Sequence, residues 1–315
     1  MTSEKIKGLV AATVTPMKAN GEVNLPALDS YVKHLEKQGL AGVFVNGTTG
    51  EGLLMTSDER KAVAEAWMAY KDKFKVMVHV GGTSYAAAVD LARHAEKIGA
   101  DAISAMGPCF LPPSRAEELV AFNKIVAAAA PGTPFYYYHI PGTSHVNVSM
   151  LDFLKLGEKE IPTLRGIKYT TYDSMTMQEC IAYRGGYYDI LHGHDETILT
   201  GLMLGATGGV GTSYSVTGEL YNKLLDTFWA GDLAGAVKEA KAAAQPGDIV
   251  VLSPACQVRK FGGRHQSHPA DYGRRLRPGA AADAQPDPRP DESARSGPAR
   301  DRLDLSAARP DGFRV

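Results

Sequence analysis

The 315-residue sequence is poor in cysteine and has no long hydrophobic run. Its three cysteines, Cys109, Cys180 and Cys256, are scattered and odd in number. That pattern argues against a disulfide framework and favours a reducing compartment, so we expect a cytoplasmic protein. No run approaches the roughly 18 apolar residues that a membrane-spanning helix needs. The polar start Met1–Lys7 leads directly into the first apolar run, so we expect no signal peptide.

An excess of positive charge and the familiar metal-binding spacings are also missing. The formal net charge is -1, so the composition favours neither nucleic acid nor an anionic membrane as a partner. The sequence contains no HExxH spacing and no CxxC pair, so we expect no dedicated metal site. With 44% hydrophobic and 22% charged residues, the composition is typical of a soluble globular protein.

What the sequence does contain is a regular alternation of short β-rich runs with helical runs. Strands are expected at 8–16, 42–47, 75–81, 102–107, 134–140, 164–170, 188–192 and 206–211. Helices are expected at 25–38, 57–70, 85–98, 115–130, 149–158, 175–183, 196–203 and 218–230. The helix at 57–70 is preceded by Thr56 with Glu59 three residues on, the spacing of a capping box.

Strands that alternate with helices predict an α/β protein with a parallel sheet. Eight such units in about 230 residues match the count and size of a (β/α)8 TIM barrel. The alternative is a doubly wound open sheet, but no GxGxxG opens the first unit. The barrel is predicted to span residues 6–230, and residues 231–245 are predicted to begin a C-terminal helical region.

Barrel enzymes place their chemistry at the carboxyl ends of the strands. Lys168 stands near the end of the sixth predicted strand. A desolvated amine there would have a lowered pKa and would be nucleophilic near neutral pH. The alternative is an exposed lysine on a solvated loop. The other strand ends supply hydroxyls, a phenol, glycines and carboxylates: Thr48, Thr49, Tyr138, Thr170, Gly193, Asp195, Glu196, Gly211 and Thr212.

Each of these residues also has a structural explanation. Thr48 and Thr49 lie between glycines before a helix, where hydroxyls and N–H groups suit a substrate carboxylate, but an ordinary turn fits too. Tyr138 shares one side of its strand with Tyr136 by alternation. Its phenol would move protons if it lies near the lysine, and it would otherwise be core packing.

The acidic pair Asp195 and Glu196 and the glycine-rich strand predicted at 206–211 each allow several interpretations. Asp195 and Glu196 would bind hydroxyls of a polyol, coordinate a cation, or cap the following helix. His194 beside them is either a loop residue or a catalytic one. Glycines such as Gly211 allow either close backbone packing or approach of a substrate to the main chain.

At these same residues the sequence resembles the N-acetylneuraminate lyase and dihydrodipicolinate synthase superfamily of class I aldolases. The matching motifs are Gly47–Glu51, Tyr138–Pro141, Gly166–Thr170 and Gly205–Tyr214, and the likeness covers about residues 6–245. The runs VNGTTGEGL and PFYYYHIP resemble the animal-type N-acetylneuraminate lyases within that superfamily. The resemblance implies a TIM barrel, a homotetramer, and an aldolase that needs no metal or organic cofactor.

The resemblance also implies roles for the strand-end residues. Lys168 would form a Schiff base with the ketone carbon of the sialic acid, and Tyr138 would shuttle protons with the substrate's carboxylate. Thr48 and Thr49 would hold that carboxylate. The residues implied to contact the hydroxyl chain are Thr170, Gly193, Asp195, Glu196 and Thr212, with Gly211 expected beside them. The products would be N-acetylmannosamine and pyruvate.

Two positions bear on the choice within the superfamily. The synthases usually carry an arginine where this chain has Thr143, and its absence favours the lyase branch. Phe44 stands where some bacterial lyases carry a tyrosine, so the hydrogen bond of that tyrosine is not expected here. The alternatives are an aldolase or synthase for another 2-oxo acid, and a catalytically inactive barrel.

The last 70 residues or so differ from the rest in composition. Residues 1–245 contain 17 Lys and 5 Arg, whereas 246–315 contain 1 Lys, 11 Arg and half of the 18 prolines. Superfamily members instead continue with further helices. We therefore predict a disordered tail that arose by a frameshift near codon 246, with a native appendage as the alternative. Replaced helices would leave apolar surface exposed on the helix predicted at 233–244 and would lower stability.

Overall fold

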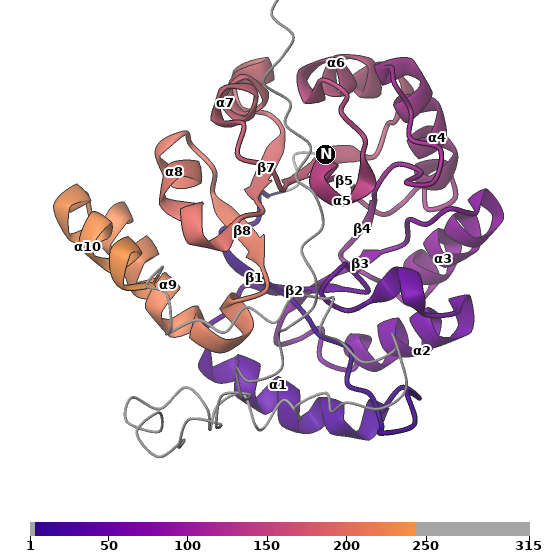
Figure 1. The fold of residues 1–315 in the computed structure, drawn as a ribbon, viewed down its shortest axis with the longest axis horizontal. Helices are drawn as coiled ribbons and strands as arrows, with labels where there is room; N and C mark the ends of the chain where they lie inside the picture. The colour runs from indigo at the N-terminus through magenta and orange to yellow at the C-terminus, as the bar shows by residue number, and fades with distance from the viewer. Residues whose placement is uncertain (1–3, 244–315) are drawn as a thin grey trace, which may run out of the picture. The chain divides into compact units, whose positions relative to one another are not determined.

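The computed structural model describes residues 4–243, and within that range eight parallel strands form a closed barrel in chain order. Figure 1 shows the strands in the centre and the helices outside them. The strands are β1 Gly8–Ala12, β2 Gly42–Val45, β3 Lys75–His79, β4 Ala102–Ala105, β5 Phe135–His139, β6 Leu164–Tyr169, β7 Asp189–His192 and β8 Gly208–Gly211. The (β/α)8 prediction is confirmed, and each strand lies inside its predicted range.

The connecting helices follow the predicted order. They are α1 Leu28–Lys37, α2 Ser57–Met68, α3 Tyr85–Lys97, α4 Ala116–Ala128, α6 Met150–Glu160, α7 Ser174–Ala182, α8 Ile198–Met203 and α9 Tyr214–Trp229. Shorter elements are η1 Leu25–Ala27, η2 Gly52–Leu54, α5 Pro141–Ser144, η3 Tyr183–Gly185 and η4 Asp195–Thr197, and α10 Leu233–Ala243 follows α9. The capping box of Thr56 with Glu59 at the start of α2 is confirmed.

Three helix starts differ from the prediction. The helix predicted at 25–38 begins as the 3-10 turn η1 and becomes α-helical only at Leu28. The helix predicted at 196–203 begins as the 3-10 turn η4 and becomes α-helical only at Ile198. The helix predicted from Gly218 begins at Tyr214, because one turn precedes a break at Thr217, where φ is -123° and ψ is 23°. Apolar periodicity detects only the regular part after such a break.

Side chains of the strands alternate between two cores. Inside the barrel lie, among others, Phe44, Tyr136, Tyr138, Leu191 and Val210. Tyr137 faces the helices and packs on Phe153 of α6, with ring centroids 4.6 Å apart. The prediction that Tyr136 and Tyr138 share a side is therefore confirmed, and the shared side is the interior.

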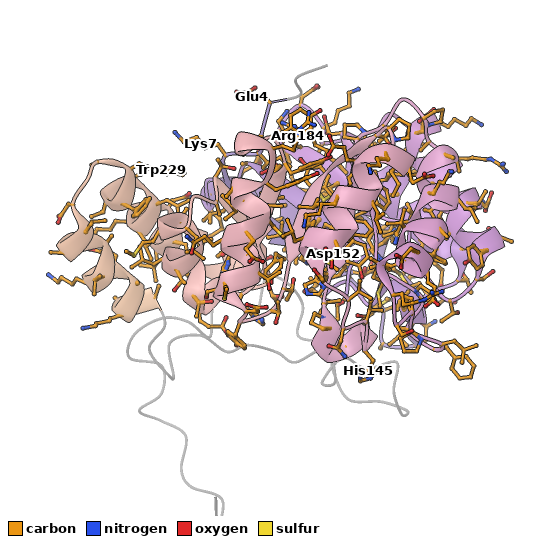
Figure 2. The ribbon with its side chains drawn as sticks, turned by 90° about the horizontal axis from the view of Figure 1, so that it is seen from above. Glu4, Lys7, His145, Asp152, Arg184 and Trp229 are labelled. Atoms are coloured by element: carbon orange, nitrogen blue, oxygen red, sulfur yellow. The ribbon has the colours of Figure 1, made fainter. Side chains whose placement is uncertain are left out.

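Residues that precede the strands and residues that follow them lie at opposite ends of the barrel. Figure 2 shows Lys7 and Arg184, which precede β1 and β7, at one end, and His145, which follows β5, at the other. The strand-end residues named above lie at the His145 end, because they follow their strands in the sequence. The barrel thus brings the carboxyl ends of all eight described strands to one face.

The prediction of a disordered, frameshifted tail at 246–315 lies outside the described residues. Helix α10 falls within 231–245, the region predicted to begin a C-terminal helical part, and its side chains Leu233 and Val237 are exposed. Across residues 4–243, no helix has the length and apolar character to cross a bilayer.

Candidate active site

Lys168 is enclosed in the barrel interior. Only 3% of its surface is exposed, and its Nζ lies 4.1 Å from the ring centroid of Phe44 and 4.0 Å from that of Tyr138. Burial lowers the pKa of Lys168 to about 7, against an opposing effect of the Asp195 carboxylate. Roughly half of the amine is then uncharged at pH 7. The alternative of an exposed strand-end lysine is wrong.

Tyr138 reaches the same space from the neighbouring strand β5, and it is 2% exposed. Its ring meets those of Phe44 and His79 edge-on, at centroid distances of 5.3 Å and 5.7 Å. Its hydroxyl lies 3.2 Å from Thr48 Oγ1. Burial raises the pKa of Tyr138 to about 12, although the Thr48 hydrogen bond lowers it. The phenol therefore keeps its proton at neutral pH.

The paired threonines after β2 face two different strands. Thr48 pairs with Tyr138 of β5, whereas Thr49 Oγ1 lies 2.7 Å from Thr212 Oγ1, just after β8. The turn that carries them requires an unusual backbone conformation and close backbone packing. Asn46 has φ 60°, and a Cβ on Gly52 would lie 1.8 Å from the Asn46 carbonyl oxygen. Glycine at position 52 lets the turn fold back on its own strand end.

A buried group that the sequence did not predict supports this turn. Asn46 Nδ2 donates to the Arg60 carbonyl at 2.8 Å, and Arg60 donates to the carbonyls of Gly81 at 3.0 Å and His79 at 2.7 Å. His79 Nδ1 lies 3.1 Å from the Asn46 carbonyl oxygen. These contacts join positions up to 33 residues apart, so no local spacing in the sequence marks them.

Asp195 and Glu196 are adjacent but have separate surroundings. The Asp195 carboxylate accepts from the backbone N–H and the hydroxyl of Ser213, both at 2.6 Å. Burial raises the pKa of Asp195, and the Ser213 hydrogen bonds oppose that shift. Glu196 is exposed and accepts from the Tyr172 hydroxyl at 3.1 Å. Both residues lie in the first turn of η4, where acidic side chains are favourable, although neither η4 nor α8 has a side-chain cap hydrogen bond.

The glycines at the strand ends allow close packing. A Cβ on Gly193 would lie 2.1 Å from Thr170 Oγ1, and one on Gly211 would lie 1.8 Å from the Asp195 carboxylate. The contact at Gly211 agrees with the close-packing interpretation of that residue. Thr170 Oγ1 is buried beside Gly193 without a hydrogen-bond partner among the described residues.

The barrel mouth therefore combines a desolvated amine, a protonated phenol, three threonine hydroxyls and the partly buried Asp195 carboxylate. Among residues 4–243, no three His, Cys, Asp or Glu side chains gather in an arrangement that would hold a metal ion. An uncharged amine in such a pocket is a nucleophile for a carbonyl carbon. The hydroxyls and the carboxylate supply hydrogen-bond partners for a polar substrate around it.

Residues 5–255 match the model of the dihydrodipicolinate synthetase family. The chain belongs to this family. Among curated members, the N-acetylneuraminate lyase of Rattus norvegicus is 42% identical over 238 residues, which is 74% of each chain. The N-acetylneuraminate lyase of Homo sapiens is 43% identical over 235 residues, or 73% of each chain.

The chain is also similar to solved structures. The N-acetylneuraminate lyase of Proteus mirabilis is 35% identical with a TM-score of 0.75, covering 87% of this chain and 98% of its own. The sialic acid aldolase of Ruminococcus gnavus is 31% identical with a TM-score of 0.72, covering 76% and 79% of the two chains. The resemblance noted from the motifs is confirmed.

Proposed function

We propose that this chain is a Schiff-base aldolase that cleaves N-acetylneuraminate into N-acetylmannosamine and pyruvate. The observation that carries the proposal is the burial of Lys168 beside Tyr138, with a pKa lowered to about 7. Relatives that cover about three quarters of the chain at 42% identity bear the name N-acetylneuraminate lyase. This name agrees with the chemistry that a dry amine supports.

In the first step the uncharged Lys168 amine attacks the ketone carbon of the open-chain sugar acid. Loss of water leaves a protonated imine, which withdraws electrons from the neighbouring carbon–carbon bond. The hydroxyls of Thr48 and Thr49 stand at the end of β2, across the interior from β6. They are proposed to hold the substrate carboxylate by hydrogen bonds, which fixes the ketone carbon over the amine.

In the second step the C4 hydroxyl loses its proton and the C3–C4 bond breaks. The aldehyde of N-acetylmannosamine leaves, and the bonding electrons pass into an enamine on Lys168. Because the Tyr138 phenol is protonated, it acts as a relay: it takes the C4 proton while passing its own to the substrate carboxylate. Protonation of the enamine at C3 and hydrolysis of the imine then release pyruvate.

The remaining polar residues suit the hydroxyl chain of the substrate. These residues lie at the ends of β6, β7 and β8: Thr170, Gly193, Asp195, Glu196 and Thr212. Gly211 packs against Asp195. We assign them to substrate binding. Resemblance to the family also leads us to propose a cytoplasmic homotetramer with sialic acid and pyruvate as its ligands and no cofactor, built on a barrel at 6–230.

Reduction with borohydride in the presence of pyruvate tests the proposal. We expect the mass of one reduced pyruvate to appear on the peptide that contains Lys168. Lys168→Met should abolish the adduct, and Lys155→Met, on the exposed face of α6, should not. No adduct on the folded wild-type chain would indicate an inactive barrel. An adduct without cleavage of N-acetylneuraminate would indicate an aldolase for another 2-oxo acid.

A further inference from the structure

Two aromatic rings stack at the edge of the barrel mouth. Tyr172 follows β6 and His194 follows β7, and their ring centroids are 4.0 Å apart with an interplanar angle of 4°. The Tyr172 hydroxyl donates to Glu196 Oε1 at 3.1 Å. The pair therefore joins two separate loops and holds a carboxylate that is otherwise exposed to solvent.

The stack is close to the proposed reaction centre. Burial is the largest cause of the lowered pKa of His194. The Glu196 carboxylate raises that pKa and the Lys168 amine lowers it, so both charges act electrostatically on the ring. Thr170 lies two residues before Tyr172, and Gly193 packs directly against Thr170. A continuous surface thus runs from the end of β6 to the loop after β7.

Core packing does not explain this arrangement. Tyr172 is 65% exposed, so its ring adds little to the buried apolar core. The only hydrogen bond recorded for its hydroxyl within the described residues goes to Glu196. A long, exposed glutamate ordinarily samples several rotamers and loses that freedom when it binds a ligand. A phenol that already fixes the carboxylate reduces this loss.

We propose that Tyr172 and His194 are specificity-determining residues that pre-position Glu196 for the hydroxyls at the far end of a long polyhydroxy 2-oxo acid. The inference rests on the proposed function, because Lys168 must bind the ketone carbon at the other end of that substrate. A substrate anchored at Lys168 and at the threonines after β2 extends toward the ends of β7 and β8. A shorter 2-oxo acid would end before it reaches Glu196.

Tyr172→Phe removes the hydroxyl and keeps the ring, so it isolates the contact with Glu196. We expect the KM for N-acetylneuraminate to rise about three- to tenfold with a smaller change in kcat. The KM for a 2-keto-3-deoxy hexonic acid should be unchanged. The control is Tyr187→Phe, an exposed tyrosine that precedes β7 at the opposite end of the barrel.

His194 is tested by two substitutions. His194→Phe retains a flat ring against Tyr172, and His194→Ala removes it. We expect the alanine variant to raise the KM for N-acetylneuraminate as Tyr172→Phe does, and the phenylalanine variant to stay near the wild type.

The outcomes separate this inference from the proposed function. If pyruvate trapping on the wild type fails, the proposed function is wrong. If trapping succeeds but Tyr172→Phe leaves the KM for N-acetylneuraminate unchanged, or raises it equally for the short acid, only the role of Tyr172 and His194 is refuted.

Discussion

At the scale of single residues, Lys168 and Tyr138 have ionisation states set by the interior of the barrel. A lysine with a pKa near 7 is reactive because the folded protein denies its charge a solvent shell. The same burial raises the pKa of Tyr138 to about 12, so its phenol stays protonated well above neutral pH. The reactivity of the site is therefore obtained at the expense of stability, as is common where function needs a buried ionisable group.

Lys168→Met should stabilise the protein. The folded-state pKa of about 7 lies below the ordinary 10.5, so between these values the unfolded chain binds more protons and stability rises with pH. Replacement by methionine removes the free-energy cost of neutralising the amine in the folded state. It should therefore raise the free energy of unfolding by roughly 2 to 4 kcal/mol at pH 7 and by much less near pH 10. Urea unfolding at both pH values measures the difference. An equal change in the free energy of unfolding at the two pH values would contradict the linkage.

Tyr138→Phe should reduce kcat for cleavage by about 10²- to 10⁴-fold, because the ring stays packed while the proton relay is lost. Trapping of pyruvate on Lys168 should persist. The matched control is Tyr136→Phe, which removes an interior phenol of the same strand whose partner is Asp189. A Tyr138→Phe enzyme with normal kcat would exclude the relay.

At the scale of elements, each strand end depends on glycines that let neighbouring backbone and side chains come close. In β8 and the loop that follows it, Gly211 gives room to the Asp195 carboxylate, which in turn binds the N–H and hydroxyl of Ser213. The Asp195 carboxylate, which follows β7, thereby binds Ser213 at the N-terminal end of α9. This contact positions Asp195 within electrostatic range of Lys168.

Gly211→Ala should displace Asp195, since the new Cβ would lie 1.8 Å from its Oδ1. We expect a loss of about 1 to 3 kcal/mol in stability from overpacking, together with a raised KM for N-acetylneuraminate. Gly142→Ala is the control for stability, because a Cβ there meets nothing within 4 Å. Unfolding curves and steady-state kinetics measure both effects. A fully stable Gly211→Ala enzyme would show that Asp195 has room to move.

At the scale of the whole molecule, Asp189 at the amino end of the barrel joins several strands through hydrogen bonds. This buried carboxylate accepts from Ile6 N at 3.0 Å, from the Tyr136 hydroxyl at 2.9 Å and from the Thr207 hydroxyl at 3.3 Å. Burial raises its pKa, and the hydrogen bonds from Ile6 and Tyr136 lower it. One side chain thus links β7 to β5 and to the segments that lead into β1 and β8.

Asp189→Ala should lower the free energy of unfolding by about 2 to 5 kcal/mol, because it leaves buried donors without an acceptor. Tyr136→Phe, which removes one donor and leaves the carboxylate in place, should cost less. Denaturant titrations of the two variants give the comparison. Equal stability of Asp189→Ala and the wild type would mean that the barrel closes without this link.

Much of the fold and part of the site followed from the sequence. Periods of 2 and 3.6 residues predicted the order of strands and helices and placed Tyr136 and Tyr138 on the same side of their strand, and the combined motifs indicated the family. The structure decided that this shared side is the interior of the barrel. Tertiary structure alone decided that Lys168 is dry. It also decided that Thr49 meets Thr212 across 163 residues and that Tyr172 stacks on His194. Local periods specify how a segment faces its own core, whereas contacts between distant loops depend on how the strands close into a ring.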